Sequence, residues 1–275
     1  MISIITPSFR QPDWLRLCAR SVADQEGVQY EHIVQEGSDD ARVESSVSQF
    51  PKLRFYREPD SGMYDAINRG LAKARGDICA YLNCDEQYLP GALARVTNFF
   101  DLHPEIDVLF GDAILADSHG NPISYRRTVL PTLAHVRYVR LNTPTCSTFF
   151  RRTLIDRGFL FDPEWKVIGD QLWMESLLSS GVSMATLTEP LAVFTFTGEN
   201  LSLTNVSLEE DERLNRSRSI IAGLRKVAAI IWLRTRKLFA GAYRSRKIEV
   251  EIYTPESPLA RQRKQARVGF GWPQK

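Results

Sequence analysis

Short apolar runs alternate with segments of helical periodicity over the first 110 residues, and this alternation most restricts the possible folds. Short apolar runs predict buried strands, and apolar residues recurring every three to four positions predict helices. The expected strands are 2–6, 30–35, 53–56, 78–82 and 108–110, and the expected helices are 13–24, 63–75 and 90–103. Strands separated by single helices predict βαβ crossovers. We therefore expect an α/β fold with a Rossmann-like, mainly parallel central sheet flanked by helices.

The second half of the chain is less regular. The pattern predicts strands over 148–150 and 184–196 and a helix over 170–179. After Leu208 it becomes one long helix, followed by a tail with scattered prolines and basic residues. We expect a body over residues 1–212 and a C-terminal basic helical extension over residues 213–275.

The net charge of +2 conceals an asymmetry along the chain. Residues 213–275 hold 16 Lys and Arg against three acids, whereas residues 1–212 hold 19 basic and 30 acidic residues. A basic extension on an acidic body predicts an anionic partner, either a membrane surface or nucleic acid. Because no recognised nucleic-acid-binding module accompanies the charge, we favour the membrane.

Apolar residues form one helical stripe through this extension. Its members are Leu224, Val227, Ala228, Ile231, Leu238, Phe239 and Tyr243. Between Arg225 and Lys247 there are eight basic residues and no acid, a combination typical of an interfacial helix on an anionic membrane. The alternative is a helix that packs on the body or on a second copy in a homo-oligomer.

Neither a bilayer-spanning apolar run nor a signal peptide is recognisable in the sequence. The four cysteines show no CxxC spacing, which favours reduced, buried thiols. We therefore expect a cytoplasmic protein that lies peripherally on the inner face of the cell membrane.

Polar or acidic loops follow four of the expected strands, at 6–9, 35–40, 57–62 and 83–86. Ligands of open α/β sheets bind outside the carboxyl ends of the strands, so these loops form the expected site. Neither a dinucleotide-binding nor a P-loop glycine motif is present. An acidic site without such a loop predicts a divalent ion, Mn²⁺ or Mg²⁺, that bridges to substrate phosphates.

Five segments, in this order, resemble the inverting family 2 glycosyltransferases with the GT-A fold, particularly bacterial enzymes of exopolysaccharide and other surface-glycan synthesis. The segments are Ile2–Arg10 (ISIITPSFR), Tyr30–Asp40 (YEHIVQEGSDD), Asp60–Glu86 (DSGMYDAINRGLAKARGDICAYLNCDE), Thr148–Arg152 (TFFRR) and Gly169–Trp173 (GDQLW). They span about residues 1–205. The resemblance implies a catalytic domain over 1–212, with a nucleotide-sugar half over about 1–112 and an acceptor half over about 113–212.

The resemblance assigns nucleotide-binding roles near the ends of the first three strands. Thr6, Pro7 and Ser8 look like the loop that lines the nucleotide base. Glu36 looks like the acid that holds the base or ribose, and Asp60 like an acid that closes over the nucleoside. As loop acids, Glu36 and Asp60 have the alternative role of forming turns or caps.

Asn83-Cys84-Asp85-Glu86 resembles the family's metal-binding DxD segment. Asp85 is the expected metal ligand, and Glu86 is expected to reach the metal or the donor sugar. A diphosphate leaving group gains negative charge in the transition state, which a divalent ion held by Asp85 would neutralise. The alternative for Asp85 is a solvated loop acid.

Asp170, at the start of an expected helix, resembles the family's general base. Glu175 is the fallback for that role, and a helix N-cap is the alternative for Asp170. Asp112 and Arg151 are expected to contact the donor sugar or the acceptor, with Arg151 facing the diphosphate. A solvated helix start is the alternative for Arg151.

Together these features predict a metal-dependent inverting glycosyltransferase that uses a nucleotide-diphosphate sugar, with a UDP-sugar the first expectation. The expected acceptor is a saccharide, lipid-linked, in bacterial surface polysaccharide synthesis. One alternative is a sugar nucleotidyltransferase, although its glycine-rich phosphate loop is missing. Another is a non-catalytic nucleotide- or glycan-binding protein.

Overall fold

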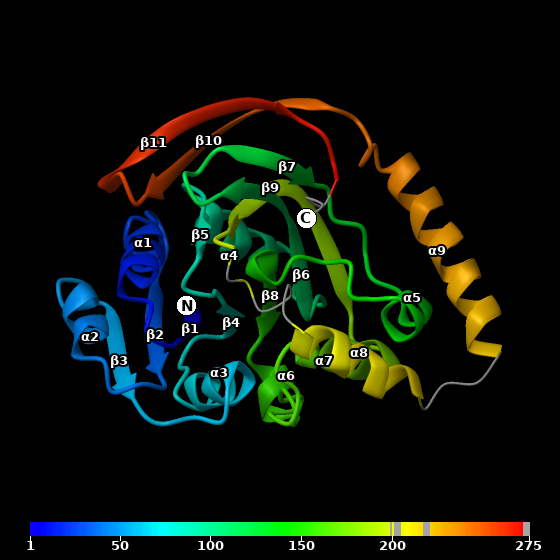
Figure 1. Ribbon diagram of the computed structural model, residues 1–275, viewed down its shortest axis with the longest axis horizontal. Coiled ribbons are helices and arrows are strands. Elements are labelled where there is room, and N and C mark those ends of the chain that lie inside the picture. The colour runs from blue at the N-terminus through cyan, green and yellow to red at the C-terminus, as the bar shows by residue number, and fades with distance from the viewer. Residues whose placement is uncertain (199, 201–204, 217–220, 272–275) are drawn as a thin grey trace.

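The computed structural model describes residues 1–198, 200, 205–216 and 221–271, and it has the expected α/β fold (Figure 1). The N-terminal half contributes parallel strands in the order β3-β2-β1-β4 to one central sheet. These strands are β1 (Ile2–Ser8), β2 (Tyr30–Glu36), β3 (Leu53–Arg57) and β4 (Ile78–Tyr81). The helices of this half are α1 (Pro12–Ala23), α2 (Ala41–Val47), α3 (Met63–Ala72) and α4 (Ala92–Leu102).

The remaining strands, all but β5 from the second half of the chain, extend the same sheet in the order β8-β6-β9-β5 beyond β4. β8 runs antiparallel to both β4 and β6, so the sheet is mixed on this side. The strands are β5 (Glu86–Tyr88), β6 (Val108–Asp117), β7 (Pro122–Arg126), which pairs with β6, β8 (Thr148–Arg151) and β9 (Met184–Phe196). The helices are α5 (Leu133–Tyr138), α6 (Thr153–Asp156) and α7 (Gly169–Ser179), with a 3₁₀ turn over Thr145–Ser147.

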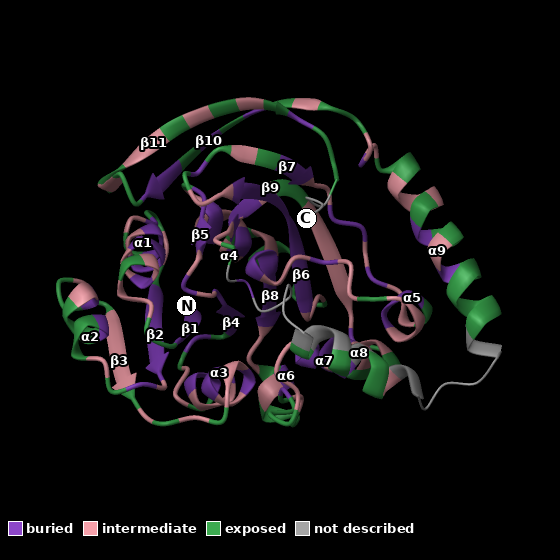
Figure 2. Ribbon diagram, viewed as in Figure 1, coloured by how far each residue is buried: buried purple, intermediate pink, exposed green. Residues whose placement is uncertain are grey.

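Helices cover both faces of the sheet, and the alternation of side chains along the strands explains why. Ile4 of β1 packs in the cluster that contains Val22 of α1 and Leu93 of α4. The next residue, Ile5, points to the opposite face, where it joins the cluster of Ile67 and Trp173. Figure 2 shows the central strands almost entirely buried between these layers. All four cysteines are free and buried, as expected.

The C-terminal segment differs from the single helix and tail that the sequence pattern suggested. Two helices are present, α8 (Asn205–Arg216) and α9 (Ile221–Phe239). They are followed by a two-stranded antiparallel hairpin, β10 (Arg246–Thr254) and β11 (Ser257–Val268). The strand signal was present, because the apolar residues of β10 alternate with charged ones, a period of two.

The hairpin arches over one side of the molecule and packs on the body (Figure 1). Ile248, Val250 and Ile252 are buried in one cluster with residues of β6 and β9. Arg261 forms an ion pair with Asp24, the residue directly after α1, with Nε 2.6 Å from Oδ2. The extension is therefore not a separate unit beyond residue 212, because its hairpin shares a core with the body.

None of the described helices is long and apolar enough to cross a membrane.

Candidate active site

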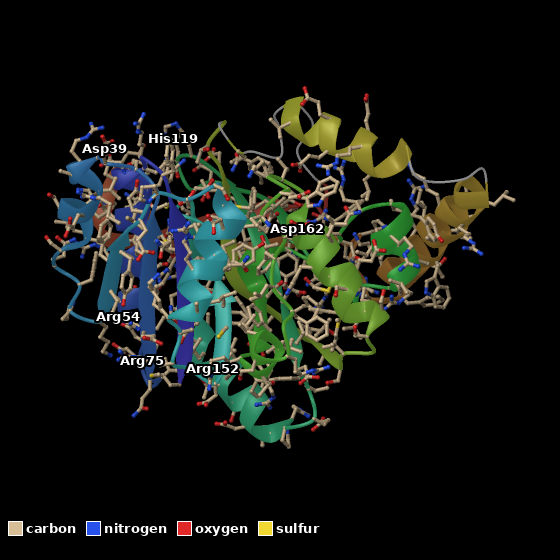
Figure 3. All side chains as sticks on the ribbon, turned by 90° about the horizontal axis from the view of Figure 1, so that it is seen from below. Asp39, Arg54, Arg75, His119, Arg152 and Asp162 are labelled. Carbon is tan, nitrogen blue, oxygen red and sulfur yellow. The ribbon has the colours of Figure 1, made fainter. Side chains whose placement is uncertain are left out.

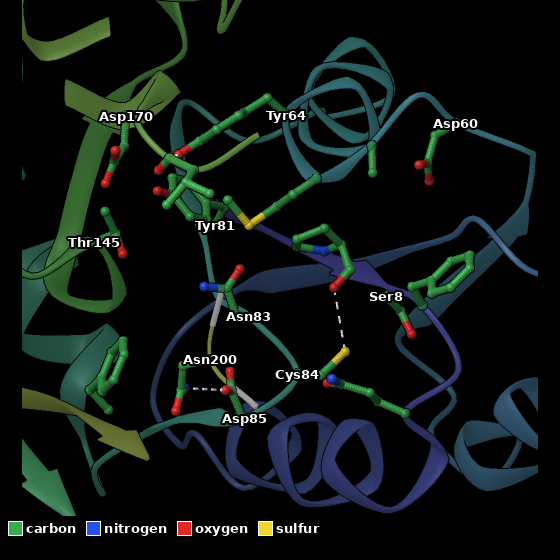
Figure 4. A pocket seen from close by; sticks show the side chains of 17 residues that line it. Ser8, Asp60, Tyr64, Tyr81, Asn83, Cys84, Asp85, Thr145, Asp170 and Asn200 are labelled. Carbon is green, nitrogen blue, oxygen red and sulfur yellow. Dashed lines mark hydrogen bonds between the residues drawn. The ribbon is translucent and has the colours of Figure 1, made fainter. Parts of the chain in front are cut away.

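A pocket of about 230 Å³ opens where the strand order reverses, between β1 and β4 (Figure 4). From β1 the chain proceeds to β2 on one side, and it returns to β4 on the other. The loops that follow β1 and β4 therefore diverge and leave a crevice at their carboxyl ends, where ligands of such sheets bind. Pro7 and Ser8 line it from the end of β1, and Asn83 and Asp85 from the loop after β4. Asp60, Tyr64 and Asp170 line it from α3 and α7 or the loops before them.

Asp85 lines this pocket, and Figure 4 shows its side chain beside that of Asn200. Its Oδ2 accepts a hydrogen bond of 2.9 Å from the side-chain amide of Asn200. Asn200 is itself held by Thr195 and Thr197, since it donates to one backbone carbonyl and accepts from one backbone amide. The amide thus fixes the orientation of the Asp85 carboxylate.

Glu86 does not line the pocket. It instead holds the backbone of the loop after β4. It is fully buried, and its Oε2 accepts a hydrogen bond of 2.8 Å from the backbone amide of Asn83. Burial raises the pKa of both Asp85 and Glu86, and the neighbouring Asp85 charge raises that of Glu86 further. A nearby cation would offset this repulsion and favour the ionised forms.

Among the described residues, no group of three or more His, Cys, Asp or Glu side chains is placed so that it could hold a metal ion. The oxygen atoms present nevertheless fit a hard divalent ion. Asp85 offers a carboxylate, and the Asn83 side-chain oxygen, also at the pocket, is buried without a hydrogen-bond partner. An ion held by these two residues would complete its shell with diphosphate oxygens and water, as Mg²⁺ and Mn²⁺ commonly do.

Asp170 lines the opposite side of the pocket from Ser8 and Asp60 (Figure 4). It lies in the first turn of α7, and burial raises the pKa of its carboxyl to about 6. The backbone amide of Gln171 donates to its Oδ1 at 2.8 Å. A carboxylate with a pKa near 6 is suited to accept a proton at neutral pH.

Glu210 of α8 holds the backbone that leads into α7. Its carboxylate accepts three backbone N–H groups, those of Lys166, Val167 and Ile168, at 2.6, 3.0 and 3.1 Å. Only 8% of Glu210 is exposed, so water competes little for these bonds. The position of Asp170, two residues further on, therefore depends on a side chain from α8.

Three of the five residues predicted to bind the nucleotide line the pocket, and two do not. Pro7, Ser8 and Asp60 line it, whereas Thr6 is buried below and bonds to the His32 ring at 2.8 Å. Glu36 is also fully buried. Its Oε1 accepts the Ser38 amide at 2.9 Å and organises the loop after β2, while its Oε2 has no partner in the protein. The contacts of Thr6 and Glu36 with a nucleotide remain predictions.

Arg151 does not reach the pocket, contrary to the expectation. It ends β8, which runs antiparallel to β4, so it lies at the opposite edge of the sheet. Figure 3 shows the adjacent Arg152 at one end of the sheet and Asp39, after β2, at the other. The Arg151 guanidinium instead donates to the carbonyl oxygens of Phe100, in the last turn of α4, and of His103 and Ile106 after it, at 2.8 to 3.2 Å.

Asp112 and Glu175 also have other partners. Asp112 is fully buried within β6 and accepts hydrogen bonds from Tyr125, Arg127 and the Thr128 amide at 2.7 to 2.9 Å. Its oxygen atoms link β6 to β7 and to the segment after β7, and they do not line the pocket. Glu175 faces α5, where Arg137 Nε lies 2.7 Å from its Oε1. Of the two candidates for the base, only Asp170 lines the pocket.

Two pocket residues, Phe9 and Asn200, and Glu210, which holds the segment before α7, are among those that were not predicted from the sequence. Phe9 follows the first strand and lines the pocket with 60% of its surface exposed. An aromatic residue beside Ser8 was a readable signal for stacking on a nucleotide base. Asn200 and Glu210 had no such signal, because their partners are 115 and about 43 residues away in the chain.

The chain matches the family model described as "Glycosyl transferase family 2" over residues 3–157. This match covers more than half of the chain, and the protein therefore belongs to glycosyl transferase family 2.

Among curated relatives, a "PGL/p-HBAD biosynthesis glycosyltransferase" of Mycobacterium bovis is 33% identical over 125 residues. That alignment covers 43% of this chain and 49% of the relative, so the chain spans about half of the relative's length. An uncharacterized glycosyltransferase of Nostoc is 26% identical over 225 residues, which cover 77% of this chain and 69% of the relative.

Solved structures share the GT-A fold. S. aureus TarS 1–349 in complex with UDP-GlcNAc has a TM-score of 0.64 at 20% identity, over 82% of this chain and 66% of that chain. The mannosyltransferase PcManGT from Pyrobaculum calidifontis, in complex with GDP-Man and Mn²⁺, has a TM-score of 0.56 at 13% identity, over 87% and 71%. At these identities the likeness concerns the fold alone.

Proposed function

We propose that this protein is a metal-dependent inverting glycosyltransferase that uses a nucleotide-diphosphate sugar. The observation that carries the proposal is the pair of carboxylates on one pocket, Asp85 after β4 and Asp170 at the start of α7. Asp85 is accompanied by the side-chain oxygen of Asn83, which has no hydrogen-bond partner and is suited to a cation. Burial raises the pKa of Asp170 to about 6, which suits a general base. A UDP-sugar is the first donor to test, since the TarS structure named above holds UDP-GlcNAc.

In the proposed reaction, Asp170 takes the proton from an acceptor hydroxyl group. The acceptor oxygen then attacks the anomeric carbon from the face opposite the diphosphate. The bond between that carbon and the diphosphate oxygen breaks, its electron pair leaves with the diphosphate, and the configuration inverts. A divalent ion held by Asp85 and Asn83 would balance the charge of the departing diphosphate.

The acceptor is proposed to be a lipid-linked saccharide of bacterial surface-polysaccharide synthesis. The mycobacterial relative is described as a glycosyltransferase of PGL/p-HBAD biosynthesis, so a biosynthetic acceptor molecule is the first class to test. Asp85 and Asp170 lie on different sides of the pocket, which leaves the Asp170 side for the acceptor hydroxyl (Figure 4).

The test compares donor hydrolysis and UDP binding in three variants of the full chain. Asp85→Asn should abolish Mn²⁺-dependent UDP binding in calorimetry, as EDTA should in the unaltered protein. Asp170→Asn should bind UDP normally but turn over roughly 10²–10⁴-fold more slowly. Glu175→Gln, on the same helix but off the pocket, is the matched control and should keep its rate. Metal-independent UDP binding, or a rate lost through Glu175 and not Asp170, would contradict the proposal.

A further inference from the structure

Helix α9 presents an apolar face to the outside of the molecule. Amphipathic helices of globular proteins normally turn their apolar side inward. Here Ala229 and Leu233, which are 5% and 9% exposed, face the body, and α9 packs against α5. The outer side carries six large apolar residues that are each 56% to 86% exposed. They are Leu224, Val227, Ile231, Trp232, Leu238 and Phe239, and we call them the α9 apolar face.

The α9 apolar face continues into a groove between α9 and α5. This groove has a volume of about 570 Å³, and Leu133, Ala134, Ala228 and Trp232 contribute to its lining. In Figure 2 exposed residues recur along the whole length of α9, which lies at the edge of the molecule. A contiguous apolar surface of this kind on a folded chain marks a site of interaction.

Basic side chains occur along α9 and in the segment directly after it. Five of the eight basic residues between Arg225 and Lys247 are exposed, and no acid occurs in this stretch. The exposed residues are Arg225, Lys226, Arg234, Arg244 and Lys247. Two others are used by the fold: Arg236 donates to the Leu130 carbonyl at 2.8 Å, and burial lowers the pKa of Lys237 to about 8.

We propose that the α9 apolar face docks on an anionic lipid bilayer and inserts into its headgroup layer. A second copy of this chain fits less well, because two such faces would bring the exposed cations of both copies close together. A nucleic acid would satisfy the cations but not the large apolar side chains. An anionic bilayer satisfies both, and each cation close to it raises binding by roughly fivefold.

The inference deepens the proposed function, since a lipid-linked acceptor would be presented at that surface, but its test does not depend on catalysis. The full chain is sedimented with vesicles of phosphatidylcholine, alone or with phosphatidylglycerol. We expect strong binding to the anionic vesicles only, and partial release at 1 M salt, where screening acts over about 3 Å. Purely electrostatic binding would be released completely.

Two variants and a control locate the contact. The double variant Ile231→Ser with Phe239→Ser should lower vesicle binding at least tenfold. The double variant Lys226→Gln with Arg234→Gln should lower binding to anionic vesicles by the same order. Leu102→Ser, on α4 and away from this face, is the control; Leu102 is 67% exposed and its variant should bind normally. All variants should keep metal-dependent donor hydrolysis in solution, so failure of the two proposals is distinguishable. Absence of vesicle binding, or a dimer in gel filtration that Ile231→Ser with Phe239→Ser dissociates, would overturn the inference.

Discussion

Ile252 tests whether the C-terminal hairpin is part of the body or a detachable appendage. It is 1% exposed and lies in the cluster that joins β10 to β6 and β9. It also packs on the turn before β7, where a Cβ at Gly120 would lie 2.6 Å from its Cδ1. The perturbation is Ile252→Ala, which removes three buried carbon atoms.

The expected loss of stability follows from this burial. Three buried carbons at about 0.8 kcal/mol each give about 2.4 kcal/mol of transfer free energy. The cavity left by partial relaxation adds to this, so we expect about 3–4 kcal/mol for Ile252→Ala. At about 2–4 °C per kcal/mol for a chain of this size, the midpoint of thermal unfolding should fall by about 6–16 °C.

The assay is thermal and urea unfolding of the full chain, followed by far-UV circular dichroism and tryptophan fluorescence. Leu259→Ala is the matched control, because Leu259 lies on β11 but is 74% exposed; its effect should stay within about 0.5 kcal/mol. If Ile252→Ala behaves like the control, or melts only a separate low-temperature transition, the hairpin does not share the core of the body.

Three further predictions concern the pocket. Phe9→Ala should weaken UDP binding by about 1–3 kcal/mol in calorimetry, if the exposed ring stacks on the base, whereas Phe239→Ala should not. Glu210→Gln removes the charge that holds the three backbone amides before Asp170, so it should lower kcat about tenfold with little change in the donor KM. The control is Glu209→Gln, at an exposed residue, which should change neither constant. Because burial raises the pKa of Asp170 to about 6 and a base must be ionised, kcat/KM should rise with pH through about 6 and level off above it. A profile that stays flat down to pH 5, equal effects at Glu210 and Glu209, or unchanged UDP affinity in Phe9→Ala would each contradict the corresponding assignment.

The loops after the parallel strands could be predicted from the sequence because the rule that places them is topological. Apolar runs separated by single helices imply parallel strands, and parallel strands end at the same edge of a sheet. This reasoning brought Ser8, Asp60 and Asp85 to one site, where all three line the pocket. The family resemblance added Asp170, which lines the same pocket from α7.

The same rule misplaced Arg151 and Asp112. Arg151 ends a strand, but β8 is antiparallel to its neighbours, and a reversed strand carries its last residue to the opposite edge. Asp112 was expected just after a strand over 108–110. β6 in fact continues to Asp117, with irregular register at Asp112, so this residue lies inside the sheet. Neither strand direction nor strand length can be read from a short apolar run.

The two sides of the pocket differ in how far the sequence determines them. The Asp85 side is built by a loop that begins where β4 ends, so local chain direction places its residues, although the distant Asn200 orients the Asp85 carboxylate. The Asp170 side depends on contacts between distant segments. Glu210 holds the backbone before α7, and Gly169 lets the Tyr64 ring pack closely, since a Cβ added there would lie 2.6 Å from the ring. Such contacts exist only once α3, α7 and α8 have packed together. Substitutions in them should therefore alter the position of the base without touching the metal loop, and this separates the Glu210 variant from Asp85→Asn in kinetic measurements.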